Sequence, residues 1–184
     1  MANPTEFNLD NGVTVIYKYV PNVKIVSVQS WIKTGSVNED KEISGISHFL
    51  EHMLFKGTKN FKVDEIDAYL DSKGGYNNAF TSVDVTNYYV TIPTKEAEAA
   101  FKVVSDMVFN ALFIPNEIEK EKPVVLQEIN RKYDDPSYKM WQDFIETLFK
   151  GTPYEMQVIG TPETVKSLTQ KKLLDYYNKF YHPE

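Results

Sequence analysis

The chain of 184 residues, with 42% hydrophobic and 14% aromatic side chains, is long enough to form one hydrophobic core in a single folded domain. Its formal net charge of −6 argues against nucleic acid or an anionic membrane surface as the main partner, and it favours basic peptides. The absence of cysteine excludes disulfides and thiolate metal ligands, so imidazole and carboxylate groups would have to hold any metal ion.

Targeting and membrane segments are not visible in the sequence. The N-terminus has no basic segment leading into an apolar run and is not rich in arginine, which argues against a signal peptide or a transit peptide. No stretch approaches the roughly 18 uncharged apolar residues of a transmembrane helix. We therefore expect a cytoplasmic protein.

The first part of the chain is predicted to form strands. The turn sequence Asp10-Asn11-Gly12 between Glu6–Leu9 and Val13–Val20 is a strong hairpin signal. Residues Val23–Thr34 are rich in β-branched side chains and predict a further strand. Its apolar side chains are expected to be buried: Ile25, Val26, Val28, Trp31 and Ile32.

Two helices and two strands are expected next. Residues 45–58 predict a helix with two apolar faces, and Val63–Ser72 predicts a second helix. After a turn at Gly74-Gly75, the β-rich segments Tyr76–Ser82 and Val85–Pro93 predict strands that pair as antiparallel neighbours.

The rest of the chain is predicted to be helical, because apolar residues recur with a 3.6-residue period. The expected elements are helices at Lys95–Leu112, Glu117–Tyr133, Ser137–Phe149 and Thr169–Tyr181, with a short capped turn at Thr161–Leu168. An aromatic cluster is expected in the core: Tyr88, Tyr89, Phe101, Phe109 and Phe113. Strands followed mainly by helices predict an α+β fold, with a mixed, largely antiparallel β-sheet and helices packed on one face.

The stretch Gly45–Thr58 contains two of the three histidines, in a pattern typical of zinc sites. On a helix, His48 and His52 lie one turn apart and about 40° from each other, so both imidazoles can bind one ion. Glu51 lies about 60° to the other side of His48, which leaves a carboxylate beside the open side of the metal. The spacing H-x-x-E-H is a known zinc-peptidase signature.

A hydrolytic zinc site has three protein ligands and an open position, so a third ligand must come from elsewhere in the chain. His182 is one candidate, but it lies near the end of the sequence. Glu121 and Glu128 are stronger candidates, because they are seven residues apart and share one face of the predicted helix. Pro123 lies in the same helix, where proline removes one backbone hydrogen bond and favours a kink.

Several blocks of the sequence resemble the pitrilysin or insulysin type of zinc metallopeptidases, the inverted zincins, which include mitochondrial processing peptidase and its bacterial relatives. The central block is His48-Phe-Leu-Glu-His52 within Gly45–Thr58. The resemblance extends to Gly74-Gly75 with Asn78-Ala79-Phe80-Thr81, to Glu121 and Val124–Ile129, and to Phe180-Tyr181-His182-Pro183.

The resemblance implies a zinc-dependent metalloendopeptidase that hydrolyses peptides or small unfolded proteins. His48, His52 and Glu128 would be the Zn²⁺ ligands, and Glu51 would activate a zinc-bound water as the general base. Glu121 would be an accessory acidic residue near the metal and part of the catalytic set. An edge strand would pair with an extended peptide substrate through Asn78, Ala79, Phe80 and Thr81.

Members of this family carry a second, similarly folded domain. Residues 1–184 are therefore expected to be the zinc-bearing N-terminal domain of a longer protein, and weakly active or inactive when isolated. The missing C-terminal domain or partner half is an expected partner, and the interface it leaves uncovered favours a homodimer of this chain.

Two alternatives stand beside an active peptidase domain. Some relatives are catalytically silent subunits of larger assemblies, although the intact set of His48, Glu51, His52 and Glu128 argues against this role. A structural zinc domain is the other alternative, and it would have a fourth protein ligand in place of water.

Overall fold

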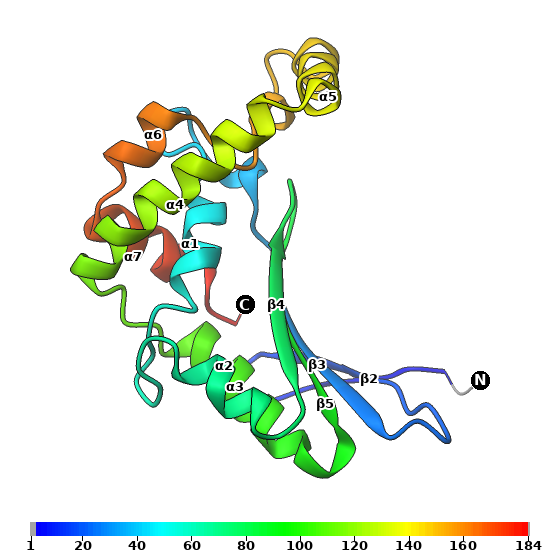
Figure 1. Cartoon of the computed structure of the whole chain (residues 1–184). Coiled ribbons are helices and arrows are strands. Elements are labelled where there is room, and N and C mark those ends of the chain that lie inside the picture. Colours follow the sequence, from blue (N-terminus) through cyan, green and yellow to red (C-terminus); the bar gives the residue numbers. More distant parts are fainter. Residues whose placement is uncertain (1–2, 184) are drawn as a thin grey trace.

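The computed structural model describes residues 3–183. Its central element is a three-stranded sheet in the order β3 (Ile25–Ile32), β5 (Thr86–Pro93) and β4 (Tyr76–Thr81). All strand pairings among the described residues are antiparallel, and the helices lie on one side of this sheet (Figure 1). The predicted α+β class is confirmed, as is the pairing of β4 with β5.

The predicted N-terminal hairpin is also confirmed. Strands β1 (Thr5–Asn8) and β2 (Thr14–Tyr17) pair as an antiparallel two-stranded sheet of their own. Gly12 in the connecting turn has a φ of 89°, a left-handed conformation that glycine adopts without strain. The hairpin extends away from the helices (Figure 1), and its side chains are almost all exposed.

The side chains of β3 alternate between a covered and an uncovered face. Val28 points into the core, whereas Ile25 and Trp31 are 59% and 56% exposed. The prediction that these two residues are buried was therefore wrong. The reason is that helices cover only one face of the sheet, so every second side chain of a strand points away from them.

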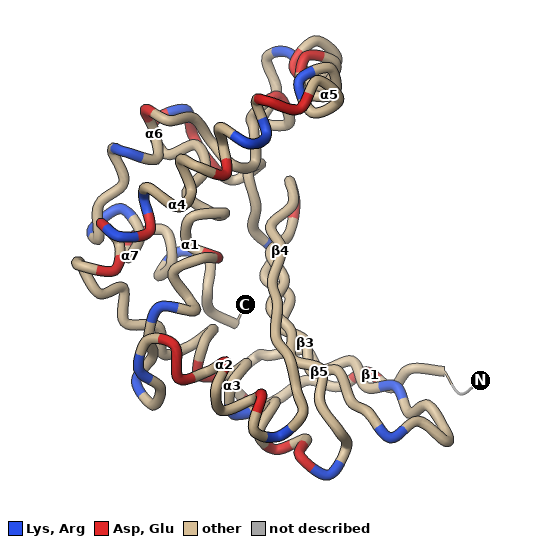
Figure 2. The backbone as a smooth tube through the Cα atoms, viewed as in Figure 1, with Lys and Arg blue, Asp and Glu red and all other residues tan. Residues whose placement is uncertain are grey.

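The three strands of the central sheet contain no Lys, Arg, Asp or Glu, and the charged residues lie on the helices, the loops and the N-terminal hairpin (Figure 2). The uncovered face instead carries aromatic pairs, with Trp31 against Phe80 and Tyr76 against Tyr89 at ring-centroid distances of 5.6 Å and 6.3 Å. Such edge-to-face pairs add to sheet stability even without a covering layer.

Seven α-helices are present among the described residues. Their bounds are α1 Ile46–Met53, α2 Glu65–Asp71, α3 Ala97–Phe109, α4 Pro115–Tyr133, α5 Pro136–Leu148, α6 Pro162–Ser167 and α7 Gln170–Phe180. Short 3₁₀ segments occur at Ser36–Asn38, Thr94–Glu96 and Pro153–Glu155. Within residues 3–183 there is no helix with both the length and the apolar character needed to cross a bilayer.

The aromatic cluster expected in the core is only partly there. Tyr88 and Phe113 are fully buried, but Phe101 and Phe109 are 61% and 45% exposed, so their predicted burial was wrong. Phe101 follows Ala100, which is fully buried, and one residue along a helix turns the side chain by about 100°. Both phenylalanines therefore lie beside the buried stripe of α3 and not within it.

Helix α1 lies at the centre of the helical layer, in contact with β4, α4 and α7. Its residues Phe49, Leu50 and Met53 are completely buried, as are Val125 and Ile129 on α4. This burial fixes α1 between the sheet and α4. The polar side chains of α1 and α4 that are not part of this core can therefore face each other in a defined arrangement.

Candidate metal centre

The start of α1 is held by a buried carboxylate. Glu39 accepts hydrogen bonds from the backbone N–H groups of Gly45 (2.7 Å) and Ser47 (2.9 Å), which are free donors at the beginning of the helix. One turn further, the rings of His48 and His52 lie side by side, with centroids 4.7 Å apart. The helical period thus places both imidazoles on one face, as their spacing predicts.

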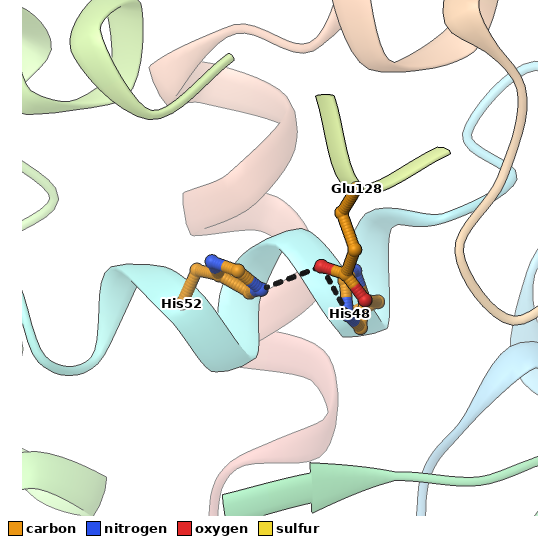
Figure 3. A group of neighbouring side chains, drawn as sticks. All are labelled: His48, His52 and Glu128. Carbon is orange, nitrogen blue, oxygen red and sulfur yellow. Dashed lines mark ion pairs between the residues drawn. The ribbon is translucent and has the colours of Figure 1, made fainter. Parts of the chain in front are cut away.

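A carboxylate from α4 lies between these two imidazoles (Figure 3). Oε2 of Glu128 is 3.6 Å from Nε2 of His48 and 3.6 Å from Nε2 of His52, and the ligand atoms of the three residues lie within 4.8 Å of one another. Donors that bind Zn²⁺ tetrahedrally at 2.0–2.1 Å are about 3.4 Å apart. The donor types therefore suit a zinc ion, and the two distances from Glu128 to the imidazoles are close to this spacing.

The electrostatic environments of the two imidazoles differ. Burial lowers the pKa of His48 to about 4, and the neighbouring His52 adds to this shift. Burial acts in the same direction on His52, but hydrogen bonding to Glu121 and Glu128 outweighs it and raises the pKa to about 9. The interaction with His52 lowers the pKa of Glu128 to about 2 against the effect of burial. Glu128 is thus a carboxylate over the whole physiological range.

Glu121 lies on the outer side of His52. Its Oε1 is 2.9 Å from Nδ1 of His52, and its Oε2 is 2.9 Å from Nζ of Lys56. These two hydrogen bonds outweigh burial and lower the pKa of Glu121. Helix α4 continues through Pro123 without interruption, and this continuity keeps Glu121 and Glu128 on the same face.

Glu51 faces a cavity of about 370 Å³ that opens next to His48. The hydroxyl group of Thr81 on β4 donates a hydrogen bond to Oε2 of Glu51 and leaves Oε1 without a hydrogen bond from the described residues. Burial raises the pKa of Glu51, and the Thr81 hydrogen bond opposes this shift. The carboxylate is thus held at one oxygen beside the group of three potential ligands.

The predicted substrate segment forms one wall of the same cavity. Ala79, Phe80 and Thr81 line it, and β4 is an edge strand of the sheet. Asn78 does not line the cavity: its side chain is exposed, and its Oδ1 accepts a hydrogen bond of 2.8 Å from the N–H of Ala79. The structure therefore brings three of these four residues to the candidate site.

Other residues near the site were not predicted from the sequence. Nζ of Lys132 lies 3.2 Å from Oε1 of Glu128, and Tyr138, Trp141 and Gln142 of α5 form the wall opposite β4. The spacing of four residues between Glu128 and Lys132 was a signal available in the sequence. For the α5 residues there was no such signal, because their position depends on the turn between α4 and α5.

His182, the other candidate for the third ligand, is exposed after the end of α7, and its ring nitrogens lie within hydrogen-bond distance of backbone carbonyl groups there.

The comparisons with known proteins agree on one family. The model of the insulinase family (peptidase family M16) matches residues 14–162. The chain is 38% identical over 183 residues to YmxG of Bacillus subtilis, described as an uncharacterized zinc protease, covering 97% of this chain and 44% of that protein. It is 36% identical over 176 residues to ML0855, an uncharacterized zinc protease of Mycobacterium leprae, covering 96% and 40%.

Solved structures give the same result. A crystal structure of a protease from Helicobacter pylori matches with a TM-score of 0.94 and 28% identity, covering 98% of this chain and 44% of that chain. The periplasmic protease PqqL from Escherichia coli matches with a TM-score of 0.89 and 28% identity, covering 98% and 21%. The chain thus spans less than half the length of these relatives.

Proposed function

Because the chain belongs to the insulinase family of peptidases, family M16, we propose that it is the zinc-bearing N-terminal domain of a longer metalloendopeptidase. The observation that carries the proposal is the convergence of His48, His52 and Glu128, from two separate helices, within 4.8 Å. Names of relatives as zinc proteases support zinc as the metal. The substrates would be peptides or small unfolded proteins.

Three atoms would hold the ion: Nε2 of His48, Nε2 of His52 and Oε2 of Glu128. A bound zinc ion supplies Lewis acidity, which lowers the pKa of water and polarises a scissile carbonyl. Glu51 then accepts a proton from the attacking water at Oε1, since Oε2 is engaged by Thr81, and passes it to the leaving amide nitrogen. The raised pKa of Glu51 favours this transfer, because a stronger base takes the proton more readily.

Glu121 would be a positioning residue. Its contact with Nδ1 of His52 keeps a proton on that nitrogen, so Nε2 is the nitrogen that would give up its proton and bind the ion. This role differs from the accessory catalytic role expected from the sequence, because Glu121 is not among the residues that line the cavity.

The peptide would lie in the cavity between β4 and α5. The free edge of β4 offers backbone groups to an extended chain, which selects substrates by conformation more than by sequence. The remainder of the substrate surface would come from the part of the parent protein beyond this chain, or from a partner half, so weak activity of the isolated domain is expected. A homodimer and a cytoplasmic location stay predictions, and the structural relative PqqL is named as a periplasmic protease.

Zinc stoichiometry and hydrolysis of a quenched fluorescent casein peptide test this function together. The variant Glu51→Gln should bind one zinc ion per chain, as the wild type does, and lose its turnover. The matched control is Glu42→Gln, because Glu42 is exposed and lies outside the site. Zinc binding without turnover in the wild type, even after the missing half is supplied, would favour a silent subunit or a structural zinc domain.

A further inference from the structure

The wall of the cavity opposite β4 contains a buried amide. Gln142 is the one buried residue of α5 and is 8% exposed, whereas its neighbours Met140, Trp141 and Phe144 are more than half exposed. A helix that packs on a domain normally buries apolar residues. A glutamine as the buried residue of this helix therefore needs a physical explanation.

The side-chain amide of Gln142 forms no hydrogen bond with any residue between 3 and 183. Its amide atoms are not among the side-chain atoms that are buried without a partner, so the amide remains open to the cavity. An amide without a protein partner can hydrogen-bond to a molecule that enters this space. Gln142 lines the same cavity as Glu51 and Thr81. Its missing partner is thus expected to be a molecule that enters the cavity.

The chemistry of the amide indicates what this molecule presents. A carboxamide offers two donor hydrogens and one acceptor oxygen, which matches the donor and acceptor of a peptide group. Trp141 and Val158 line the same cavity and supply the apolar contacts that a cavity for a peptide needs around a few polar groups. The amide is uncharged, so it recognises the backbone regardless of the charge of the substrate side chains.

We propose that Gln142 binds the backbone of a peptide substrate from the side opposite β4. This inference rests on the proposed function for the nature of the ligand. The edge of β4 would pair with one side of the extended peptide, and the Gln142 amide would hydrogen-bond to a peptide group on the other side. Gln142 is then a substrate-binding residue without a part in proton transfer.

A binding role and a structural role of Gln142 predict different effects of the same substitution on the stability of the free protein. If the amide serves only to bind a ligand, replacing it by an apolar side chain of similar length breaks no hydrogen bond of the free protein and leaves its stability unchanged or higher. If Gln142 has only a structural role, the same replacement lowers stability. Gln142→Met provides this replacement, and Gln127→Met is the matched control because Gln127 is exposed on α4 outside the cavity.

The experiment measures binding of a fluorescein-labelled casein peptide by anisotropy, on chains that carry Glu51→Gln so that the peptide is not cleaved. Gln142→Met should weaken binding about fivefold to tenfold, with zinc content unchanged and a melting temperature equal to or above that of its parent. In the wild-type background the same substitution should raise KM and leave kcat within about twofold. Gln127→Met should change none of these values.

Three results would overturn the proposal. The first is unchanged peptide affinity in Gln142→Met, and the second is weaker binding together with a lower melting temperature. The third is a Glu51→Gln chain that binds no peptide. Zinc-dependent hydrolysis by the wild type, lost in Glu51→Gln, would show in each case that the proposed peptidase function still stands.

Discussion

Oε1 of Glu121 lies 2.9 Å from Nδ1 of His52, so a carboxylate on α4 holds the outer nitrogen of an imidazole on α1. The second imidazole has no such support, because Nδ1 of His48 is buried without a hydrogen-bond partner among residues 3–183. Carboxylates that bind the free nitrogen of a ligating histidine fix its tautomer and orientation. The candidate metal centre is therefore asymmetric, and its orientation depends mainly on His52.

The substitution Glu121→Ala is expected to lower zinc affinity by about 10-fold to 100-fold, because His52 would lose the partner that fixes its ring. Glu119→Ala is the matched control, since Glu119 is on the same helix but is exposed and forms an ion pair with Lys122. Competition with a zinc-binding dye measures both affinities. Equal affinities of the two variants would show that Glu121 does not support the site.

Zinc binding is expected to release a proton from His52. Its pKa is raised to about 9, so His52 carries both ring protons in the metal-free chain at neutral pH, and Nε2 must lose one before it can bind the ion. His48, with a pKa of about 4, is already neutral. The apparent zinc affinity should thus rise about tenfold per pH unit between these two pKa values and become level above that of His52.

Calorimetry in two buffers with different ionisation enthalpies measures this release, and about one proton per zinc ion is expected at neutral pH. Glu121→Gln removes the charge that raises the pKa of His52, so the affinity of this variant should become level at a lower pH. A zinc affinity that does not change with pH would contradict the raised pKa of His52.

The hydrogen bond from Thr81 to Glu51 predicts an effect on turnover. Thr81→Val keeps the shape and β-propensity of the side chain but removes the donor, so Glu51 should lose its fixed orientation. We expect kcat to fall about tenfold, with zinc content unchanged, because hydrogen bonds to charged groups contribute about 1.5–3 kcal/mol. Thr81→Ser restores the hydroxyl and should recover most of the activity. If Val and Ser variants had the same kcat, the hydroxyl would have no such role.

The position of the His48 and His52 imidazoles on one helical face could be predicted from the sequence, because it depends only on the geometry of one helix. The separate positions of Glu121 and Glu128 could not. The two residues share a helical face, and only the position of α4 along α1 decides that Glu128 lies between the imidazoles while Glu121 lies outside them. That position follows from the burial of Val125 and Ile129 and from the contact of α4 with α1, which are properties of the whole core.

Two further features could not be predicted, because they also depend on how the elements pack: the cavity wall formed by α5, and which face of the sheet stays uncovered. Gln142 reaches the cavity only because the chain turns between α4 and α5, and the residues of this turn carry no signal for its direction. Trp31 was predicted on the correct strand but on the wrong side of it. The sequence of one strand shows that its side chains alternate, but not which face the helices will cover.

Two glycines allow a last prediction about how α1 is held in place. Gly45, at the start of α1, has a φ of +88°, and a Cβ atom there would lie 2.6 Å from the carbonyl oxygen of Ile159 and 2.8 Å from Cα of Gly160. Gly151 has a similar φ of +79°, but a Cβ atom there would meet nothing within 4 Å. An alanine at either position is strained by about 1–2 kcal/mol in this left-handed conformation.

Both variants carry the same backbone strain, so the difference between their free energies of unfolding measures the cost of the steric clash between α1 and the segment at Ile159. We expect Gly45→Ala to be the less stable variant by at least about 2 kcal/mol, because backbone atoms must move apart to make room. Its zinc affinity should fall as well, since the shift begins three residues before His48. Urea unfolding of the metal-free chains and zinc titration measure the two effects. Equal losses in both variants would mean that α1 can move at this contact without strain.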